Sequence, residues 1–184
     1  TAQLRDSIAN LEQRVTDRTT ALEASRLESE QRAKDLLAIS EVSRIINVEK
    51  NPDILLPLIT RLVSEKFNFY HVGIFLLDDT KRSAILQATN SEGGQRMLLR
   101  GHALAIGQGI VGTVALEGKP RIALDVGDES VFFNNPDLPS TRSEMALPMK
   151  IREQVIGVLD VQSQRRGEFT EDDLNILGIL ASQV

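Results

Sequence analysis

The first 51 residues contain no glycine, no proline and no aromatic residue, and 17 of them are charged. A stretch without helix-breaking residues and with frequent opposite charges favours one long α-helix over a packed domain. Apolar residues recur at Leu4, Ile8, Leu11 and Val15, in steps of four, three and four. That spacing places them on one narrow stripe, as in the seam where two helices of a coiled coil meet.

This apolar stripe is too narrow to be buried by a helix that stands alone. Fifty helical residues would extend over about 75 Å, and a second copy of the chain would cover the stripe. The stripe weakens around Ser25, Ser29 and Arg32, which is either a defect or a segment that permits two helix packings of similar energy. A disordered, charged tail is the alternative, although it does not account for the absence of helix breakers. We predict a parallel homodimer with these interface residues: Leu4, Ile8, Leu11, Val15, Leu22, Leu36 and Ile39.

The remainder of the chain has a different composition. All seven aromatic residues lie beyond residue 66, and the first glycine is Gly73. With 41% hydrophobic residues over 184 positions, the chain can form one ordinary core besides the helix. The change in composition falls near Pro52, where Asn51 and the proline together favour the start of a helix.

Composition excludes several classes of function. The formal net charge of −5 argues against nucleic acid as a partner, because phosphate binding needs a basic surface. The absence of cysteine excludes disulfides, thiolate zinc sites and cysteine nucleophiles, and two histidines are too few for a metal site unless many carboxylates contribute. No apolar run is long enough to cross a membrane. The chain starts without methionine and stops within an apolar helical pattern at Val184, so we expect a segment of a longer protein.

The pattern after residue 51 predicts an α+β domain with an antiparallel sheet flanked by helices. Residues 127–142 are polar and without periodicity, which is typical of a binding loop or a flap. Thr170 and the three acidic residues after it favour a helix start, where they complement the helix dipole. We predict helices over 52–66, 110–116 and from 171 onward, and strands over 70–77, 83–89, 97–106, 121–126, 144–151 and 155–162.

One motif points to a nucleotide. Gly107, Gly109 and Gly112 form G-x-G-x-x-G between an expected strand and an expected helix, as in dinucleotide-binding folds. The helix would be only about two turns long, and the strands after Asp125 form a hairpin instead of parallel crossovers. The favoured interpretation is a tight turn from strand to helix. Other catalytic motifs are missing, and His71 and His102 are each interpreted as structural or solvent-facing residues.

Several segments together resemble GAF domains. They are the glycine motif extended to Ala115, then Gly118–Pro120, Arg142–Pro148, Val155–Ser163 and Phe169–Leu174. The resemblance covers about residues 36–184, so we divide the chain into a coiled-coil helix over 1–35 and a GAF domain over 36–184. It implies a central antiparallel sheet of five or six strands, with helices from both ends of the chain on one face. A small-molecule pocket is implied on the other face.

The resemblance also bears on the ligand, whose identity it leaves unknown. Bilin-binding members need a cysteine, which this chain lacks. Cyclic-nucleotide members carry Asn-Lys followed by Phe-x-x-x-Asp-Glu; here Phe169 and Asp173 match, but Gln162, Ser163 and Leu174 differ, which disfavours a cyclic nucleotide. The ligand-contacting residues that the resemblance implies are Tyr70, Asp125, Phe132, Phe133, Arg142, Glu144 and Met145.

The first helix is similar to those that link modules in bacterial sensor histidine kinases. We therefore expect a non-catalytic, dimeric sensory module of a cytoplasmic signalling protein, with a histidine kinase as the first candidate for its effector. The alternatives are a GAF spacer without ligand, a regulator of a diguanylate cyclase and, least favoured, a dinucleotide-binding enzyme. No metal site is expected.

Overall fold

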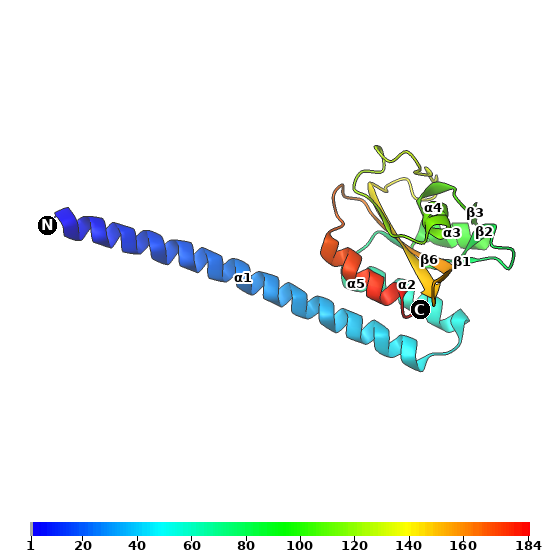
Figure 1. Cartoon of the computed structure of the whole chain (residues 1–184), viewed down its shortest axis with the longest axis horizontal. Coiled ribbons are helices and arrows are strands. Elements are labelled where there is room, and N and C mark those ends of the chain that lie inside the picture. The colour runs from blue at the N-terminus through cyan, green and yellow to red at the C-terminus, as the bar shows by residue number, and fades with distance from the viewer. Residues whose placement is uncertain (1) are drawn as a thin grey trace. The chain divides into compact units, whose positions relative to one another are not determined.

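The computed structural model describes residues 2–184 and contains five helices and six strands in that range (Figure 1). The first helix, α1, runs over Ala2–Val48, in agreement with the helix predicted from the absence of breakers. Two compact units divide the chain between Ala38 and Ile39. No helix among the described residues is apolar and long enough to cross a membrane.

The second unit is built on one antiparallel sheet. Its strands are β1 (His71–Leu77), β2 (Ser83–Thr89), β3 (Ala103–Ala105), β4 (Arg121–Ala123), β5 (Ser143–Ile151) and β6 (Gln154–Ser163). They lie in the order β3-β2-β1-β6-β5-β4, and each adjacent pair is antiparallel. The predicted α+β class and antiparallel sheet are confirmed.

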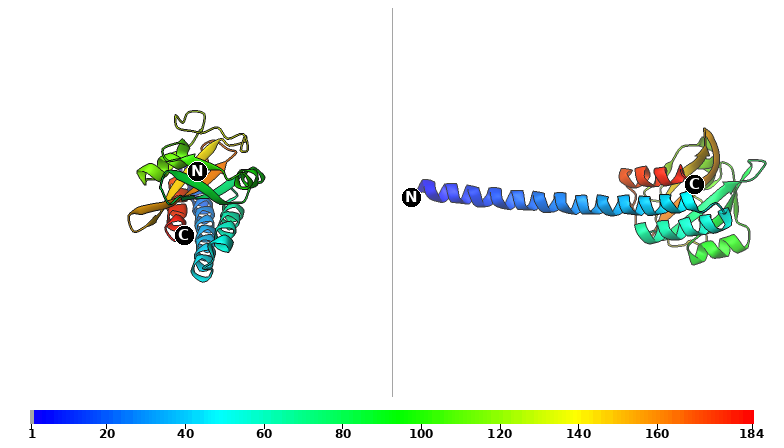
Figure 2. Two further views of the ribbon diagram at one scale, coloured as in Figure 1. Left: turned by 90° about the vertical axis from the view of Figure 1, so that its right-hand side faces the viewer. Right: turned by 90° about the horizontal axis from the view of Figure 1, so that it is seen from below.

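One face of this sheet is covered by helices from both ends of the domain (Figures 1 and 2). These are the last turns of α1, α2 (Pro52–Phe67) and α5 (Glu171–Ala181). Val42 and Ile46 of α1 join the buried core there, together with Ile59 of α2 and Leu177 of α5. The helix starts follow the sequence: Asn51 accepts a hydrogen bond from the Asp53 amide, and Thr170 and Asp173 form a capping box.

The opposite face of the sheet carries a second core and two short helices. These are α3 (Glu92–Leu99) and α4 (Gly109–Glu117). The polar segment 127–142, which follows β4 and contains no helix or strand, belongs to the same layer. Side chains alternate between the two faces of a sheet along a strand. In β6, Leu159 and Val161 therefore pack in the core under α2 and α5, and Val158 packs in the core on the opposite face. The same alternation places Asp160 and Gln162 on the side of α3 and α4.

The strand predicted over 97–106 is wrong in its first half. The structure has α3 over Glu92–Leu99 instead, and only Ala103–Ala105 pair with β2. The adjacent pair Gly93 and Gly94 disfavours a helix by propensity, but Ser91 caps the helix by accepting the Gly94 amide at 3.0 Å. Close packing against the sheet also requires glycine here, since a Cβ on Gly94 would lie 2.1 Å from Thr89 Oγ1. The strand predicted over 121–126 is shorter than expected and ends at Ala123.

Candidate functional site

A cavity lies between the sheet and the layer formed by α3, α4 and the 127–142 segment. It has an empty volume of about 350 Å³, part of which is open to solvent. The part of this space that an atom the size of water can occupy is about 30 Å³, which is room for about two water molecules. Its lining residues are Phe75, Met97, His102, Leu104, Gly109, Ile110, Val111, Phe133, Asn135, Leu138, Glu144, Asp160 and Gln162.

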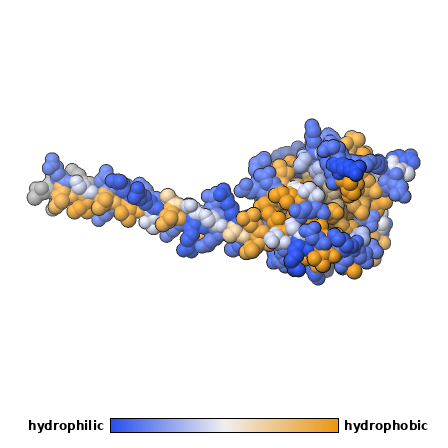
Figure 3. All heavy atoms as spheres, turned by 60° about the horizontal axis from the view of Figure 1, so that its bottom comes forward, coloured by the Kyte–Doolittle hydropathy of each residue, from blue (hydrophilic) through white to orange (hydrophobic). Residues whose placement is uncertain are grey.

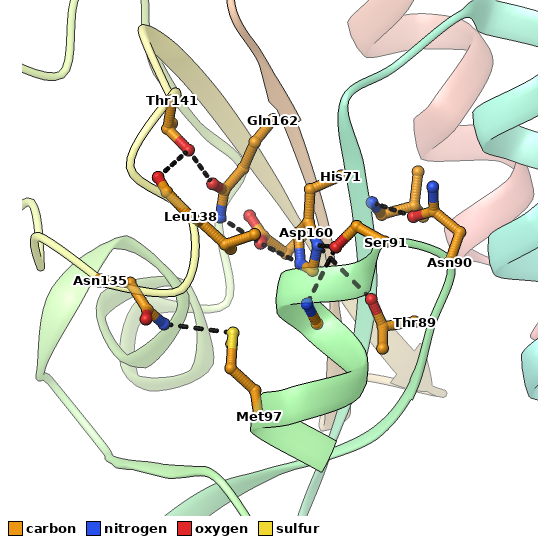
Figure 4. A network of polar contacts seen from close by, with 12 residues as sticks. His71, Thr89, Asn90, Ser91, Met97, Asn135, Leu138, Thr141, Asp160 and Gln162 are labelled. Carbon is orange, nitrogen blue, oxygen red and sulfur yellow. Dashed lines mark hydrogen bonds and ion pairs between the residues drawn. The ribbon is translucent and has the colours of Figure 1, made fainter. Parts of the chain in front are cut away.

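Two carboxyl groups form the polar floor of this cavity. Glu144 on β5 is 5% exposed and Asp160 on β6 is 1% exposed. Asp160 Oδ2 accepts a hydrogen bond from Gln162 Nε2 at 2.8 Å, and Gln162 Oε1 accepts from Thr141 Oγ1 at 2.6 Å (Figure 4). Asp160 Oδ1 is buried and has no hydrogen-bond partner among residues 2–184 when the carboxyl groups of Glu144 and Asp160 are both ionised. Such a buried acceptor is costly unless a donor reaches it.

Burial dominates the protonation of both carboxyls. It raises the pKa of Asp160 to about 7, against hydrogen bonds from Gln162 and Glu144 that lower it. Burial also raises the pKa of Glu144 well above its usual range, and the charge of Asp160 raises it further. Two carboxylates this close cannot both ionise easily in a buried site. The pair therefore holds at least one proton near neutral pH.

His71 lies behind Asp160, at the start of β1, with none of its side chain exposed. Its Nδ1 is 2.7 Å from Ser91 Oγ, and its Nε2 is 3.8 Å from Asp160 Oδ2, too far for a hydrogen bond (Figure 4). Burial, and then the charge of His102, lowers the pKa of His71 to about 3. The ring is thus neutral, and the contact with Asp160 is not an ion pair. Ser91 Oγ accepts from the Gly94 amide, so its proton is free for Nδ1, which favours the Nε2–H tautomer.

The 127–142 segment is fixed to α3 by charged and polar contacts. The carboxylate of Asp137 pairs with Arg96 Nε at 3.1 Å and with the guanidinium of Arg100. The hydrogen bond from Arg100, followed by the one from Arg96, lowers the pKa of Asp137. Asn135 also donates to the sulfur of Met97 at 3.3 Å. These contacts hold Phe133, which is 41% exposed, at the cavity.

Two of the residues implied by the resemblance line the cavity, Phe133 and Glu144. Met145 follows Glu144 on the same strand, so it points to the other face and is buried in the helix-covered core. Tyr70 lines a separate surface depression beside Phe69 and Arg165.

Three others implied by the resemblance do not line the cavity either. Asp125 pairs with Arg166 Nε at 2.9 Å, and its Oδ1 accepts the Gly127 amide. Phe132 is half-buried and packs against the second core. Arg142 is exposed, with its backbone amide bonded to the Ser163 carbonyl.

Sequence reasoning missed Asp160, Gln162 and His71 as members of the site. A pattern was present: in the run from Val158 to Gln162, apolar residues alternate with Asp160 and Gln162 on a strand that has no exposed face. A carboxylate at such a position indicates a polar cavity or a paired charge. Gln162 occupies the position where cyclic-nucleotide-binding members carry asparagine. In the structure its side chain donates a hydrogen bond to Asp160.

The glycine motif serves the turn between β3 and α4. Gly107 and Gly109 have φ of 88° and 68°, which favour glycine, and a Cβ on Gly112 would lie 2.5 Å from the Ala105 carbonyl oxygen. Since every strand pair among the described residues is antiparallel, this is not a dinucleotide-binding Rossmann fold. Residues 2–184 contain no cluster of three or more His, Asp or Glu side chains placed to hold a metal ion.

The described residues thus form an α+β domain in which terminal helices cover one face of an antiparallel six-stranded sheet and a cavity lies on the other face. Comparison with known proteins agrees: the family model described as GAF domain matches residues 49–184. The chain therefore belongs to the GAF domain family.

The chain is also similar to three known proteins. It is 28% identical over 152 residues to GAF domain-containing protein A of Dictyostelium discoideum, covering 83% of this chain and 89% of that protein. It is 32% identical over 82 residues to the free methionine-R-sulfoxide reductase of Escherichia coli, covering 44% of this chain and 48% of that protein. The structure of free methionine-R-sulfoxide reductase from Neisseria meningitidis with its substrate matches at a TM-score of 0.71 and 23% identity, covering 79% of this chain and 83% of that one. At that identity the structural likeness shows the fold alone.

Proposed function

We propose that this chain is a sensory and dimerisation module of a cytoplasmic signalling protein, and that its GAF domain binds a small molecule in the cavity above β5 and β6. One observation carries the proposal: Asp160 is only 1% exposed and lines the cavity beside the buried carboxyl group of Glu144. A domain that served only as a spacer would gain stability from an apolar residue at this position.

Native mass spectrometry of the freshly purified protein tests ligand binding. A compound that is retained under native conditions and released on denaturation supports the proposal. If no compound is retained, and incubation with a cell metabolite extract adds no mass, the ligand-free spacer is the better description.

Dimerisation through α1 rests on the side chains of the predicted seam. Ile8, Leu11 and Val15 are 49%, 60% and 58% exposed, and Figure 3 shows apolar residues gathered along one side of this helix. Exposed apolar residues in coiled-coil register need a partner helix, and a second copy of the same stripe is complementary to it. Leu4, Leu22 and Leu36 are also exposed, whereas Ile39 is half-buried against the core of the GAF domain.

The proposed relay connects cavity occupancy to the terminal helices. Asn90, next to the α3 cap Ser91, donates to Ser64 Oγ of α2 at 2.7 Å, and Lys66 of α2 pairs with Glu41 of α1 at 2.7 Å. A ligand that prefers one packing of these helices would shift their equilibrium. A histidine kinase is our first proposal for the effector, and a diguanylate cyclase would use the same relay.

Sulfoxide reduction is a second candidate because two of the relatives above are free methionine-R-sulfoxide reductases. The chain contains no cysteine, so no thiol of its own can reduce a sulfoxide. We propose that the chain is not an enzyme. The test is incubation with free methionine R-sulfoxide and dithiothreitol: methionine formed above the rate without protein would contradict this proposal.

A further inference from the structure

We propose that the buried carboxyl pair of Glu144 and Asp160 is a pH-dependent switch for the 127–142 segment: the protonated pair keeps the segment closed over the sheet, and loss of protons from the pair opens it. The proposal goes beyond the proposed function, because the switch requires neither a ligand nor a second copy of the chain. It rests on three features of the fold. These are two carboxyl groups in one buried site, a covering segment with few backbone bonds to the sheet, and hydrogen bonds that connect the two.

The strand register brings the two carboxyl groups together. Ala146 of β5 pairs with Asp160 of β6, and Glu144 pairs with Gln162, so Glu144 and Asp160 are diagonal neighbours on one face of the sheet. A hydrogen bond joins their side chains, and a carboxyl group can donate it only while protonated. No lysine or arginine among residues 2–184 lines the cavity, whose enclosed space of about 30 Å³ holds about two water molecules. Ionisation therefore places negative charge where there is little water to hydrate it.

The 127–142 segment covers the pair with few backbone bonds to the sheet. Three of its residues line the same cavity as the two carboxyl groups. The backbone amides of 127–141 that form hydrogen bonds use acceptors at most three residues away. Only at the end of the segment does the amide of Arg142 bond to the Ser163 carbonyl of β6. Side-chain contacts therefore hold the segment closed, and a segment of this kind can open locally without unfolding of the domain.

Two contacts connect the charge of the pair to the segment. Asp160 Oδ2 accepts from Gln162 Nε2 at 2.8 Å, and Gln162 Oε1 accepts from Thr141 Oγ1 at 2.6 Å, so the segment is bonded to the pair through one side chain (Figure 4). Glu129 of the segment also acts on the pair, because its charge contributes to the raised pKa of Glu144. An ionised pair repels the carboxylate of Glu129 in return, which favours opening.

The other titratable groups around the pair do not neutralise it. His71 on β1 has its Nε2 3.8 Å from Asp160 Oδ2, and His102, just before β3, lines the cavity; burial lowers the pKa of both rings. Arg121 of β4 pairs with Glu129 at 2.8 Å and does not line the cavity. Among the described residues of α3 and α4, none with a titratable side chain lines it. The charge on the pair thus depends on the pH and on the state of the segment.

Burial decides the direction of the switch. In the closed state, burial raises the pKa of Asp160 to about 7 and that of Glu144 well above its usual range. Opening hydrates both groups and returns their pKa values toward the ordinary 3.8 and 4.5, so the closed state binds more protons than the open one. Opening therefore becomes more favourable as the pH rises from about 4 to about 7, by up to about tenfold per pH unit for each proton released.

Amide hydrogen exchange of the full chain at pH 5, 6, 7 and 8 tests the switch. Each rate is divided by the intrinsic exchange rate at that pH, which leaves the opening equilibrium. For peptides from 127–142 this equilibrium should rise at least about tenfold between pH 5 and pH 7. Addition of 1 M urea should change it less than about twofold, whereas exchange through global unfolding should increase about tenfold or more. A rise with the urea dependence of global unfolding, or no rise, would overturn the proposal.

Two double variants separate the pair from general effects of charge. Glu144→Gln with Asp160→Asn removes both titrating groups and keeps their shapes, so the pH dependence over 127–142 should be lost. Glu153→Gln with Asp79→Asn makes the same two substitutions at exposed positions and should retain it. Equal pH dependence in the two variants would contradict the switch. Circular dichroism checks that both fold, and if the first does not, the exchange of the unsubstituted protein with and without urea decides.

The protonation of His71 provides a second test on the unsubstituted protein. Nitrogen NMR of its ring should report the neutral form from pH 5 to pH 8, in keeping with its lowered pKa. If His71 instead becomes charged as Asp160 ionises, the histidine neutralises the pair within the closed domain. That result would overturn the proposal, because the loss of protons would then leave no net charge to open the segment.

Discussion

At the scale of single residues, the site holds two buried titratable groups, a histidine whose pKa is lowered and an aspartate whose pKa is raised. Burial keeps His71 neutral by lowering its pKa to about 3, and keeps Asp160 partly protonated by raising its pKa to about 7. In both cases the uncharged form is favoured because a charge loses its hydration. The polar residues beneath the cavity therefore carry little net charge near neutral pH.

The raised pKa of Asp160 makes a prediction about stability. An unfolded Asp160 titrates near 3.8 and the folded one near 7, so the folded protein binds more protons between these values and loses stability as the pH rises through them. Asp160→Asn cannot titrate. Relative to the unsubstituted protein, it should gain on the order of 1–2 kcal/mol on going from pH 5 to pH 8.

Urea unfolding at both pH values measures this difference. The opposite trend from His71, whose lowered pKa makes stability rise as the pH increases from about 3 to 6.5, is present in both proteins and cancels. Asp79→Asn, at an exposed position, serves as the control and should show no such gain. An equal difference at pH 5 and pH 8 for Asp160→Asn would contradict the assigned pKa.

A second prediction at this scale concerns Asp137. Asp137→Ala removes both arginine pairs and leaves Arg96 and Arg100 without their shared partner. We expect a small loss of stability and faster amide hydrogen exchange over 127–142. Asp128→Ala in the same segment is the control, because Asp128 is exposed and forms no ion pair among the described residues. Unchanged exchange in Asp137→Ala would show that other contacts hold the segment.

At the scale of elements, short structures position the cavity. The turn from β3 into α4 is only three residues long and brings the start of α4 to the cavity. Gly112 permits this because the helix passes close to the Ala105 carbonyl, and Gly107 and Gly109 supply the positive φ values. The same three glycines that matched a nucleotide motif thus serve packing and turn geometry.

Substitution of Gly112 tests this assignment. A Cβ would lie 2.5 Å from backbone oxygen, so Gly112→Ala must displace β3 or α4 and should cost about 2–3 kcal/mol. Gly167→Ala is a matched control: its φ is 63° and no atom lies within 4 Å of the added Cβ, so only backbone strain of about 1 kcal/mol applies. Thermal unfolding that ranks Gly167→Ala as the more damaging variant would refute the close-packing role.

At the scale of the whole molecule, the chain combines a helix with an exposed apolar stripe and a domain that contains its own two cores. The domain can fold without a partner because its apolar side chains are buried on both faces of the sheet. The stripe on α1 has no such cover within the first unit. Association of two chains would therefore depend on the helix and leave the fold of the domain unchanged.

Introducing charged residues into the apolar stripe of α1 tests whether dimerisation depends on this helix. Leu11→Asp combined with Val15→Asp places four carboxylates in the seam of a dimer and should raise the dimer dissociation constant more than about 100-fold. Gln13→Asp with Thr16→Asp adds the same charges outside the stripe and should leave a dimer intact. Sedimentation velocity at micromolar concentration distinguishes the two. A dimer that persists in the first variant would place the interface elsewhere.

Local patterns were sufficient for most of the elements. The helix caps at Asn51 and Thr170, the seam spacing in α1 and the alternation in β5 and β6 act over a few neighbouring residues, so the sequence reveals them directly. The error at α3 has a tertiary cause: Gly93 and Gly94 disfavour a helix locally, but close contact with Thr89 and Asp137 requires residues without a side chain.

The sequence by itself determined the α+β class, the long first helix and the family resemblance, because periodicity and caps depend on near neighbours. Only the tertiary structure decided which residues meet at the cavity. Asp160 and Phe133 line it and His71 lies behind Asp160, although they belong to two strands and a loop far apart in the chain, so their meeting depends on strand order and register. The shifted pKa values follow from that meeting, since burial is a property of the packed domain and not of the residue.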